Sequence, residues 1–110
     1  MSSNPAQPAD SAYPFPLLIR QLLYTPLATS PRQEIVYADK RRYDYGTFAE
    51  RIARLASALT GLGVKPGDTV AVMDWDSHRY LECFFAVPMM GAVLHTINVR
   101  LSPEQILYTV

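Results

Sequence analysis

Apolar residues recur with helical spacing most clearly in the stretch that follows Gly46. These positions are separated by four, three, four and three residues, at Phe48, Ile52, Leu55, Leu59 and Leu62. The spacing places them in one stripe along a helix. Thr47 and Glu50 have the spacing of a capping box, which predicts that the helix begins at that threonine. Gly61 and Gly63 predict its end, since glycine is typical just after a helix.

A shorter apolar pattern of the same period comes earlier, at Leu17, Leu18, Leu22 and Leu23. Pro16 suits the first position of such a helix, and Pro26 predicts its end, because proline has no amide hydrogen to donate inside a helix. An isolated helix of this length is marginal in water, so it must pack on something. We expect it to pack on its own domain; packing on a partner subunit is the alternative.

Two short segments with strand character, 34–38 and 43–45, flank the charged tetrapeptide 39–42. Two strands around a polar turn predict a β-hairpin. The turn carries three basic residues, Lys40, Arg41 and Arg42. They could form a phosphate-binding patch, but charged residues at a hairpin tip are more often a solvated turn, which is the interpretation we favour.

The second half of the chain alternates strand, helix and strand. Residues 69–73 and 92–97 are short and mostly apolar. Residues 79–90 between them are apolar on most sides, with Ser77 as a helix cap and Gly91 as a stop. This order predicts a βαβ unit with parallel strands. Strands this apolar favour a sheet covered on both faces.

The last segment predicts the start of another helix. Ser102 is its cap, Pro103 takes the first helical position and Gln105 the third. The sequence ends inside this helix, and we expect the chain to be a fragment of a longer protein. The predicted fold class is therefore α/β, with a β-hairpin plus a βαβ unit with parallel strands.

Composition limits the classes of function. The chain has 110 residues, 49% of them hydrophobic, and a formal net charge of zero. These values are typical of a globular domain, and the balanced charge gives no reason to expect nucleic acid as a partner. Residues 1–12 have little to bury and predict a disordered tail, so we assign the domain to residues 13–110.

No apolar run approaches the length of a transmembrane segment, and the N-terminus lacks the basic start of a signal peptide. We therefore expect a cytoplasmic protein without a transmembrane segment. Cys83 is the only cysteine, so no disulfide can form within the chain. Its apolar neighbours predict a buried, inert thiol.

The residues that could carry chemistry are few. His78 and His95 show no metal-ligand spacing with each other or with Cys83, and no Gly-x-Ser-x-Gly motif marks a nucleophile. Asp74 and Asp76 follow a predicted strand, where side chains often face a ligand. A loop that leads into a helix favours acidic residues in any case, so we favour a structural role for both. We likewise favour a hydrogen-bonded core histidine at His95.

Three sequence motifs follow one another along the chain. Residues 43–48 are Tyr-Asp-Tyr-Gly-Thr-Phe, and residues 63–70 are Gly-Val-Lys-Pro-Gly-Asp-Thr-Val. The longest, residues 86–106, has the form Ala-Val-Pro-x-Met-Gly-Ala-Val-Leu-His-Thr-x-Asn-x-Arg-Leu-Ser-Pro-Glu-x-Ile. Together they resemble the adenylate-forming acyl-CoA synthetases, in their fatty-acyl-CoA ligase branch. Phe48 departs from the family's first motif, which has leucine there.

The resemblance implies that the chain is the first part of the large N-terminal domain of such an enzyme. Intact members join a carboxylate to ATP, release pyrophosphate and pass the acyl group to coenzyme A, with Mg²⁺ spreading the phosphate charge. The family's phosphate loop, Thr-Glu motif, ribose-binding Asp and catalytic Lys are not among these residues. We therefore assign no catalytic, cofactor-binding or metal-binding residue. We expect this chain alone to be inactive and to bind no cofactor.

The substrate that the resemblance implies for the intact enzyme is a medium- or long-chain fatty acid. A ligase for another organic acid is the alternative within the family, and a free-standing, non-catalytic interaction module is the alternative outside it. We also expect a homo-oligomer, or a self-associating fragment, because strands without neighbours leave edges and apolar surface exposed. The sequence leaves open what Asp74, Asp76, His95 and Arg100 contact.

Overall fold

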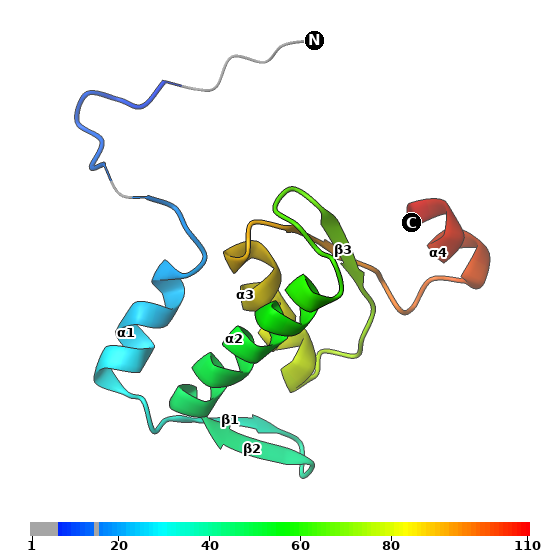
Figure 1. The fold of residues 1–110 in the computed structure, drawn as a ribbon, viewed down its shortest axis with the longest axis horizontal. Helices are drawn as coiled ribbons and strands as arrows, with labels where there is room; N and C mark the ends of the chain where they lie inside the picture. Colours follow the sequence, from blue (N-terminus) through cyan, green and yellow to red (C-terminus); the bar gives the residue numbers. More distant parts are fainter. Residues whose placement is uncertain (1–6, 15) are drawn as a thin grey trace.

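The computed structural model describes residues 7–14 and 16–110, which form helices and two small sheets (Figure 1). In chain order the elements are α1 (Gln21–Thr29), β1 (Glu34–Tyr37), β2 (Arg41–Asp44), α2 (Tyr45–Gly61), β3 (Thr69–Val72), α3 (His78–Met89), β4 (Val93–Thr96) and α4 (Pro103–Thr109). The predicted α/β class is confirmed. Residues 1–6 of the predicted tail lie outside the described residues, and residues 7–12 are exposed, without helix or strand. None of the described helices has the length and apolar character needed to cross a membrane.

Strands β1 and β2 form the predicted hairpin, paired antiparallel along their whole length. The turn between them is shorter than predicted, because it comprises residues 38–40. Arg41 and Arg42, which we placed in the turn, belong to β2 instead. Ala38 has a φ of 48°, a left-handed conformation that lets the chain reverse within so few residues.

Helix α2 follows β2 without a break. Its cap is Asp44, whose carboxylate accepts a 2.8 Å hydrogen bond from the Thr47 amide. The prediction that Thr47 caps the helix is therefore wrong. The helix begins at Tyr45 because the last residue of β2 already satisfies a free amide of the first turn. The helix ends as predicted at the glycine turn, where Gly63 has a φ of 101°.

Helix α1 does not have the predicted bounds. It begins at Gln21, after turns in residues 16–20, and continues past Pro26 to Thr29. Pro26 removes one amide donor from the helix, but its own carbonyl still accepts a 2.9 Å hydrogen bond from the Ser30 amide. The proline therefore does not end the helix, and the prediction that it does is wrong.

Strands β3 and β4 pair in parallel, as predicted, with Thr69 opposite Val93. Contacts of the turn that follows α3 fix how the two strands are aligned. Gly91, with a φ of 84°, lies so close to Pro66 that a Cβ on the glycine would come within 3.2 Å of the proline Cβ. The Gly67 amide also donates to the Gly91 carbonyl at 2.8 Å. These contacts join the turn before β3 to the turn before β4 and so set the register.

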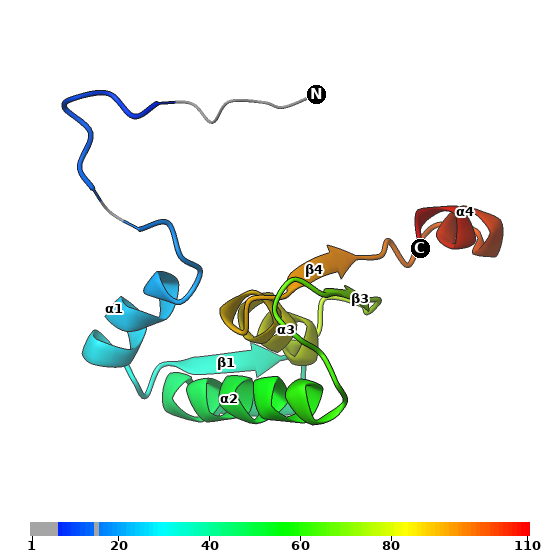
Figure 2. The same cartoon turned by 45° about the horizontal axis from the view of Figure 1, so that its top comes forward.

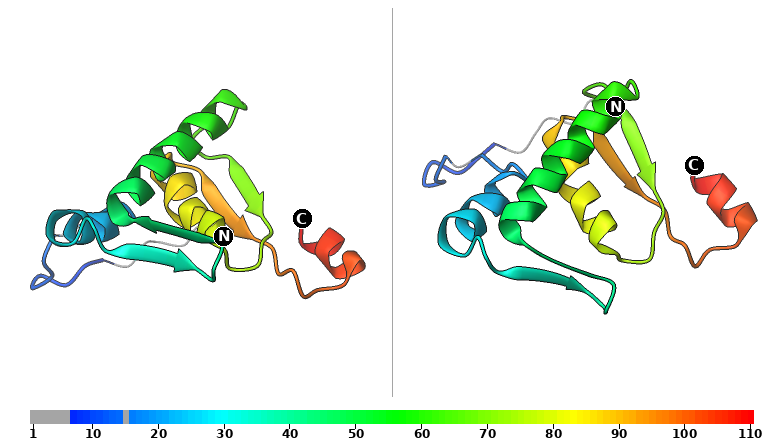
Figure 3. Two further views of the ribbon diagram at one scale, coloured as in Figure 1. Left: turned by 90° about the horizontal axis from the view of Figure 1, so that it is seen from below. Right: turned by 60° about the horizontal axis from the view of Figure 1, so that its bottom comes forward.

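Helix α3 lies between α2 and the β3–β4 sheet (Figure 2). Beyond the sheet, α4 stands apart from the rest of the molecule, on the side opposite α1 (Figure 3). No residue of β3 or β4 is buried, and Val93 is 55% exposed. The prediction of a sheet covered on both faces is therefore wrong for the described residues, because α3 is the one helix among them that packs extensively on the sheet.

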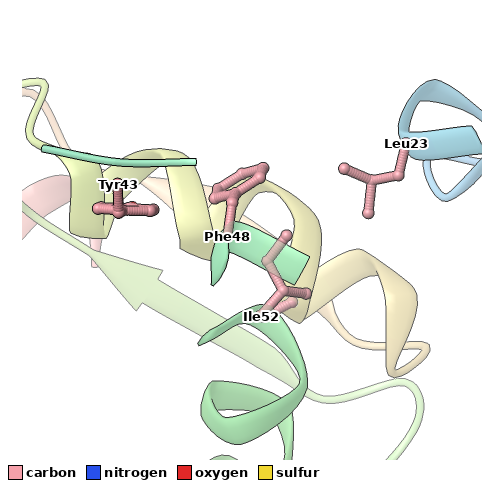
Figure 4. Close-up of a cluster of buried hydrophobic side chains, with 5 residues drawn as sticks. Leu23, Tyr43, Phe48 and Ile52 are labelled. Carbon is pink, nitrogen blue, oxygen red and sulfur yellow. The ribbon is translucent and has the colours of Figure 1, made fainter. Parts of the chain in front are cut away.

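The core lies where α1, the hairpin, α2 and α3 meet. Its buried members are Leu23, Tyr43, Phe48, Ile52 and Ala86. Figure 4 shows Leu23 of α1 extending toward Phe48 and Ile52 of α2. The Phe48 ring also meets the Phe85 ring edge to face, with the centroids 5.4 Å apart, a favourable aromatic geometry. The predicted stripe of α2 is thus buried at its N-terminal end, whereas Leu62 at the other end is 82% exposed.

Candidate functional site

Ligands of parallel sheets usually bind at the carboxyl ends of the strands, and Asp74 lies just beyond β3. Its carboxylate accepts a 2.7 Å hydrogen bond from the Trp75 amide and a short one from the Ser77 hydroxyl. These bonds, first that from Ser77, lower the pKa of Asp74. Ser77 in turn caps α3 by accepting from the Tyr80 amide at 3.3 Å. Asp74 therefore orders the start of α3, in line with a structural role.

The other side chains of this edge are exposed. The Arg100 guanidinium lies 5.8 Å from the centroid of the Trp75 ring, which is 63% exposed. The Arg100 amide donates to the Asn98 side-chain oxygen at 2.9 Å. Asp76 has a φ of 36° and makes no ion pair with another described residue. The edge thus presents one cation, one indole ring and one free carboxylate to solvent.

His95 lies on β4, opposite Ala71 of β3. It is half-buried, and its ring makes no hydrogen bond with another described residue. The prediction of a hydrogen-bonded core histidine is therefore wrong among the described residues, because the ring is only half-buried and makes no hydrogen bond there.

A buried polar network was not predicted from the sequence. Glu82 of α3 is 4% exposed. Its carboxylate accepts hydrogen bonds from Nε and Nη2 of Arg51, the second at 3.2 Å to Oε1, and from the Tyr43 hydroxyl at 3.2 Å to Oε2. The three side chains come from α3, α2 and β2, so this network ties the hairpin to both helices. The available signal was the single acidic residue of α3, at an inner position of a mostly apolar helix.

The charges of this network compensate one another. Burial, then the neighbouring Glu82 charge, raises the pKa of Tyr43, so its hydroxyl stays protonated and can donate. The hydrogen bonds to Glu82 also raise the pKa of Arg51. A buried carboxylate is tolerated when it is paired and hydrogen-bonded, and both conditions hold here. The network therefore holds elements together rather than offering a free reactive group.

His78 packs beside this network, at the start of α3. Its ring centroid lies 5.5 Å from that of Tyr37 and 6.0 Å from that of Tyr43. Its Nδ1 is buried and has no hydrogen-bond partner among the described residues. Burial lowers the pKa of His78, against the opposing effect of the Glu82 charge. The imidazole is therefore neutral at pH 7. Within the described part of the chain, no three His, Cys, Asp or Glu side chains are gathered as metal ligands.

The basic residues of the hairpin make contacts within the molecule. The Arg41 guanidinium lies 6.0 Å from the Tyr43 ring centroid, and Arg42 Nη1 donates to Glu34 at 3.1 Å. The Arg42 side chain is 67% exposed and that of Glu34 is 45% exposed. These contacts agree with a solvated surface rather than with a phosphate-binding patch.

A hollow of about 450 Å³ lies between two helices, and we call it the α2–α3 groove. It is lined by Arg51, Arg54, Leu55, Arg79, Glu82 and Cys83. Cys83 is half-buried rather than buried as predicted, because it borders this open groove. Burial, the largest influence, raises the pKa of the Cys83 thiol. The thiol stays protonated at neutral pH, which agrees with the inert character predicted for it.

The sequence is similar to that of known ligases. The chain is 46% identical over 81 residues to a long-chain-fatty-acid–CoA ligase of Thermus thermophilus, an alignment that covers 70% of this chain and 15% of that protein. It is 37% identical over 99 residues to a 3-methylmercaptopropionyl-CoA ligase of Ruegeria lacuscaerulensis, covering 86% of this chain and 18% of that protein. The chain thus spans less than a fifth of the length of either relative.

The fold is also similar to that of a solved enzyme. It matches the crystal structure of an anthranilate CoA ligase in complex with anthranoyl-AMP with a TM-score of 0.76 and 25% sequence identity, over 86% of this chain and 19% of that one. The sequence signature described as AMP-binding enzyme matches residues 24–110. That match takes in the hairpin, α2, the βαβ unit and α4. On this evidence the chain belongs to the AMP-binding enzyme family.

Proposed function

We propose that, in a protein of the relatives' full length, this chain forms the opening part of the adenylate-forming domain of a medium- or long-chain fatty-acid–CoA ligase. The observation that carries the proposal is the 46% identity with the long-chain-fatty-acid–CoA ligase of Thermus thermophilus. That identity extends over 81 residues, so it does not depend on one short motif.

The proposed reaction has two steps. The acid carboxylate attacks the α-phosphate of ATP, which forms an acyl-adenylate and releases pyrophosphate. The coenzyme A thiol then attacks the acyl carbon, which forms the thioester and releases AMP. Mg²⁺ would lower the charge on the phosphates. The described residues gather no metal-ligand set, and the buried carboxylate of Glu82 is already paired, so we assign no step to a residue of this chain.

The contribution that we propose for these residues is positional. The Tyr43–Arg51–Glu82 network fixes α3 against α2 and the hairpin, and α3 in turn carries the β3–β4 sheet. The test is the full-length protein assayed with octanoate and palmitate, ATP and coenzyme A. AMP and acyl-CoA formed in equal amounts are expected. The 110-residue chain should show no ATP–pyrophosphate exchange with either acid, and exchange by the chain alone would contradict the proposal.

A second candidate is a ligase for another organic acid. Its support is the 37% identity over 86% of the chain with the 3-methylmercaptopropionyl-CoA ligase of Ruegeria lacuscaerulensis. A substrate panel on the full-length protein separates the two. The kcat/KM value should be measured for each of four acids: octanoate, palmitate, 3-methylmercaptopropionate and benzoate. A preference for a fatty acid supports the first candidate, and a preference for either of the others supports the second.

The candidate from another class is a free-standing interaction module with this fold. It predicts a native protein whose mass equals that of these 110 residues. The ligase proposal predicts a mass several times larger, and intact-mass spectrometry on the protein made from its own gene distinguishes them. Cell fractionation of the same protein tests the proposed cytoplasmic location, which predicts recovery in the soluble fraction.

Self-association of the 110-residue chain is a further part of this proposal. Both edges of the β3–β4 pair lack a neighbouring strand among the described residues. Large apolar side chains near them are exposed, with Met73 at 54% and Val93 at 55%. Unpaired strand edges and apolar surface favour association. Sedimentation velocity should therefore show dimers or larger species whose fraction grows with concentration; a monomer at every concentration would contradict this.

A further inference from the structure

The α2–α3 groove contains more arginine side chains than carboxylates to pair with them. Three arginines and one carboxylate line it. Arg51 is paired with Glu82, whereas Arg54 and Arg79 make no ion pair with any described residue. Both of these arginines are exposed. The groove therefore has two arginines without an ion pair and no free carboxylate. A further acid, Asp74, lies outside its lining, and the Arg79 charge helps to lower the pKa of that carboxyl.

The guanidinium of the ion pair is engaged by its neighbours. Nε and Nη2 of Arg51 donate to Glu82, and Arg51 also interacts with Tyr43, whose ring centroid lies 5.3 Å from the guanidinium carbon. The donors that an anion in the groove can meet are therefore those of Arg54 and Arg79.

The rest of the groove is apolar. Leu55 of α2 and Cys83 of α3 form its uncharged lining. The methylene stems of the arginines add apolar surface below their charged ends. The groove volume, about 450 Å³, lies within the range of small-molecule sites. A ligand that fits this surface has an anionic head and a short apolar tail.

We propose that the α2–α3 groove binds a free carboxylate with an alkyl tail, with the head between Arg54 and Arg79 and the tail along Leu55 and Cys83. Guanidinium and carboxylate groups are geometrically matched, since parallel N–H donors can meet both oxygens. The groove lies between α2 and α3, whereas the loops after β3 and β4 lie at the carboxyl edge of the sheet. The proposal does not rest on the proposed ligase activity, because it concerns binding without ATP or coenzyme A.

The first test uses the full 110-residue chain, labelled with nitrogen-15, at pH 7.5. Sodium octanoate is added below its micelle-forming concentration while amide shifts are followed. We expect saturable shifts in residues 51–55 and 79–83. Arg54→Gln and Arg79→Gln should each weaken binding about 1.4- to 5-fold, the range of an exposed ion pair. The matched control, Arg41→Gln on the hairpin, removes the same charge and should leave the affinity unchanged.

Three results of this titration would overturn the proposal. They are shifts confined to residues outside both helices, equal affinity in the Arg54→Gln, Arg79→Gln double variant, and equal affinity for the uncharged analogue octanol. Acetate should bind at least tenfold more weakly than octanoate, because each methylene placed against apolar surface contributes to binding. Equal binding of acetate would show that no tail site exists.

The only cysteine supplies a second test that needs no variant. Cys83 lines the groove, so bound octanoate should slow its alkylation by the neutral reagent iodoacetamide. Acetate at the same concentration should not. An alkylation rate unaffected by saturating octanoate overturns the proposal even if the arginine variants fail to fold.

A third arm separates a free acid from a lipid surface. The chain is mixed with phosphatidylglycerol vesicles and floated on a density gradient. Binding of octanoate with no arginine-dependent flotation supports the free carboxylate. Flotation that depends on Arg54 and Arg79, with no octanoate-induced shifts, assigns the groove to a membrane surface and overturns the proposal.

Discussion

The two halves of this molecule differ in how well they bury their apolar residues. In the first, the hairpin, α2 and the adjoining face of α3 enclose Phe48, Ile52 and a paired carboxylate, Glu82. In the second, β3, β4 and α4 contain no buried residue. Yet the longest family motif, residues 86–106, lies mostly in that second half. An apolar pattern therefore identifies surface suited to burial, whereas stability depends on the surface that is actually covered.

The largest expected effect comes from Phe48→Ala, which removes the aromatic centre of the first half. Deleting a buried phenylalanine side chain lowers the free energy of unfolding by about 3–5 kcal/mol. Leu107→Ala is the matched change in the second half, where the side chain is 76% exposed; it should alter stability by less than about 0.5 kcal/mol. Urea unfolding followed by circular dichroism measures both. Similar losses in the two variants would erase the contrast between the halves.

The next effect tests the polar network of the first half. Glu82→Gln removes the charge that pairs with Arg51 and should lower the free energy of unfolding by about 2–3 kcal/mol, within the range for a charged hydrogen bond. The loss is reduced because the Arg51 side chain is 26% exposed. Glu34→Gln breaks the exposed pair with Arg42 and should cost about 0–1 kcal/mol.

A paired replacement sharpens this test. Arg51→Met in a Glu82→Leu background should recover much of the stability lost in Glu82→Leu alone, because an apolar pair of similar volume can replace a buried ion pair. Urea unfolding of the two single variants and the double variant forms the cycle. Strict additivity of the two losses would show that the side chains do not interact.

Helix caps give a smaller contrast. Ser77→Ala removes the cap of α3, which is packed on both sides, and should lower the free energy of unfolding by about 1 kcal/mol. Ser102→Ala removes the capping box of α4, which stands apart. It should reduce the helical signal without moving the main urea transition. A shift of that transition in Ser102→Ala would mean that α4 is part of the cooperative unit.

The smallest effect is a dependence of stability on pH. The pKa of His78 is lowered in the folded chain, so the unfolded chain takes up the proton at higher pH. Stability should be complete above about pH 6.5, the ordinary histidine pKa, and should fall as the pH drops below it toward the folded pKa. His78→Gln should flatten this slope between pH 7 and 5. The lowered pKa values of Asp44 and Asp74 act lower, below about pH 4.

Features that depend on neighbouring residues were predictable from the sequence. The hairpin and the caps at Ser77 and Ser102 follow from patterns within a few positions, and the parallel pairing follows from the order strand, helix, strand. The bounds of α1 were not predictable in this way. A proline usually indicates a helix end, but the carbonyl of Pro26 still accepts a hydrogen bond and the helix continues. The cap of α2 was misassigned because Asp44 and Thr47 both suit the position, and the turn geometry decides between them.

The candidate sites were harder to predict from the sequence. Arg51 and Glu82 are 31 positions apart in the sequence and lie on two different helices. No local pattern specifies which arginine pairs with which carboxylate. The α2–α3 groove exists because two helices pack side by side, which sets which of their arginines share one surface. The sequence gives the charge of each residue, but the arrangement of these charges in space depends on the tertiary packing.

The core cluster also has a consequence for how the chain folds during synthesis. Four of its five members, Leu23, Tyr43, Phe48 and Ile52, lie between positions 23 and 52, and the fifth is Ala86. Contacts between residues close in sequence form with little loss of loop entropy. A nascent chain can therefore collapse the hairpin onto α2 before the ribosome has made α3. Until residue 82 has been synthesised, Arg51 has no carboxylate to pair with. The ion pair with Glu82 therefore forms last and completes the first half of the molecule.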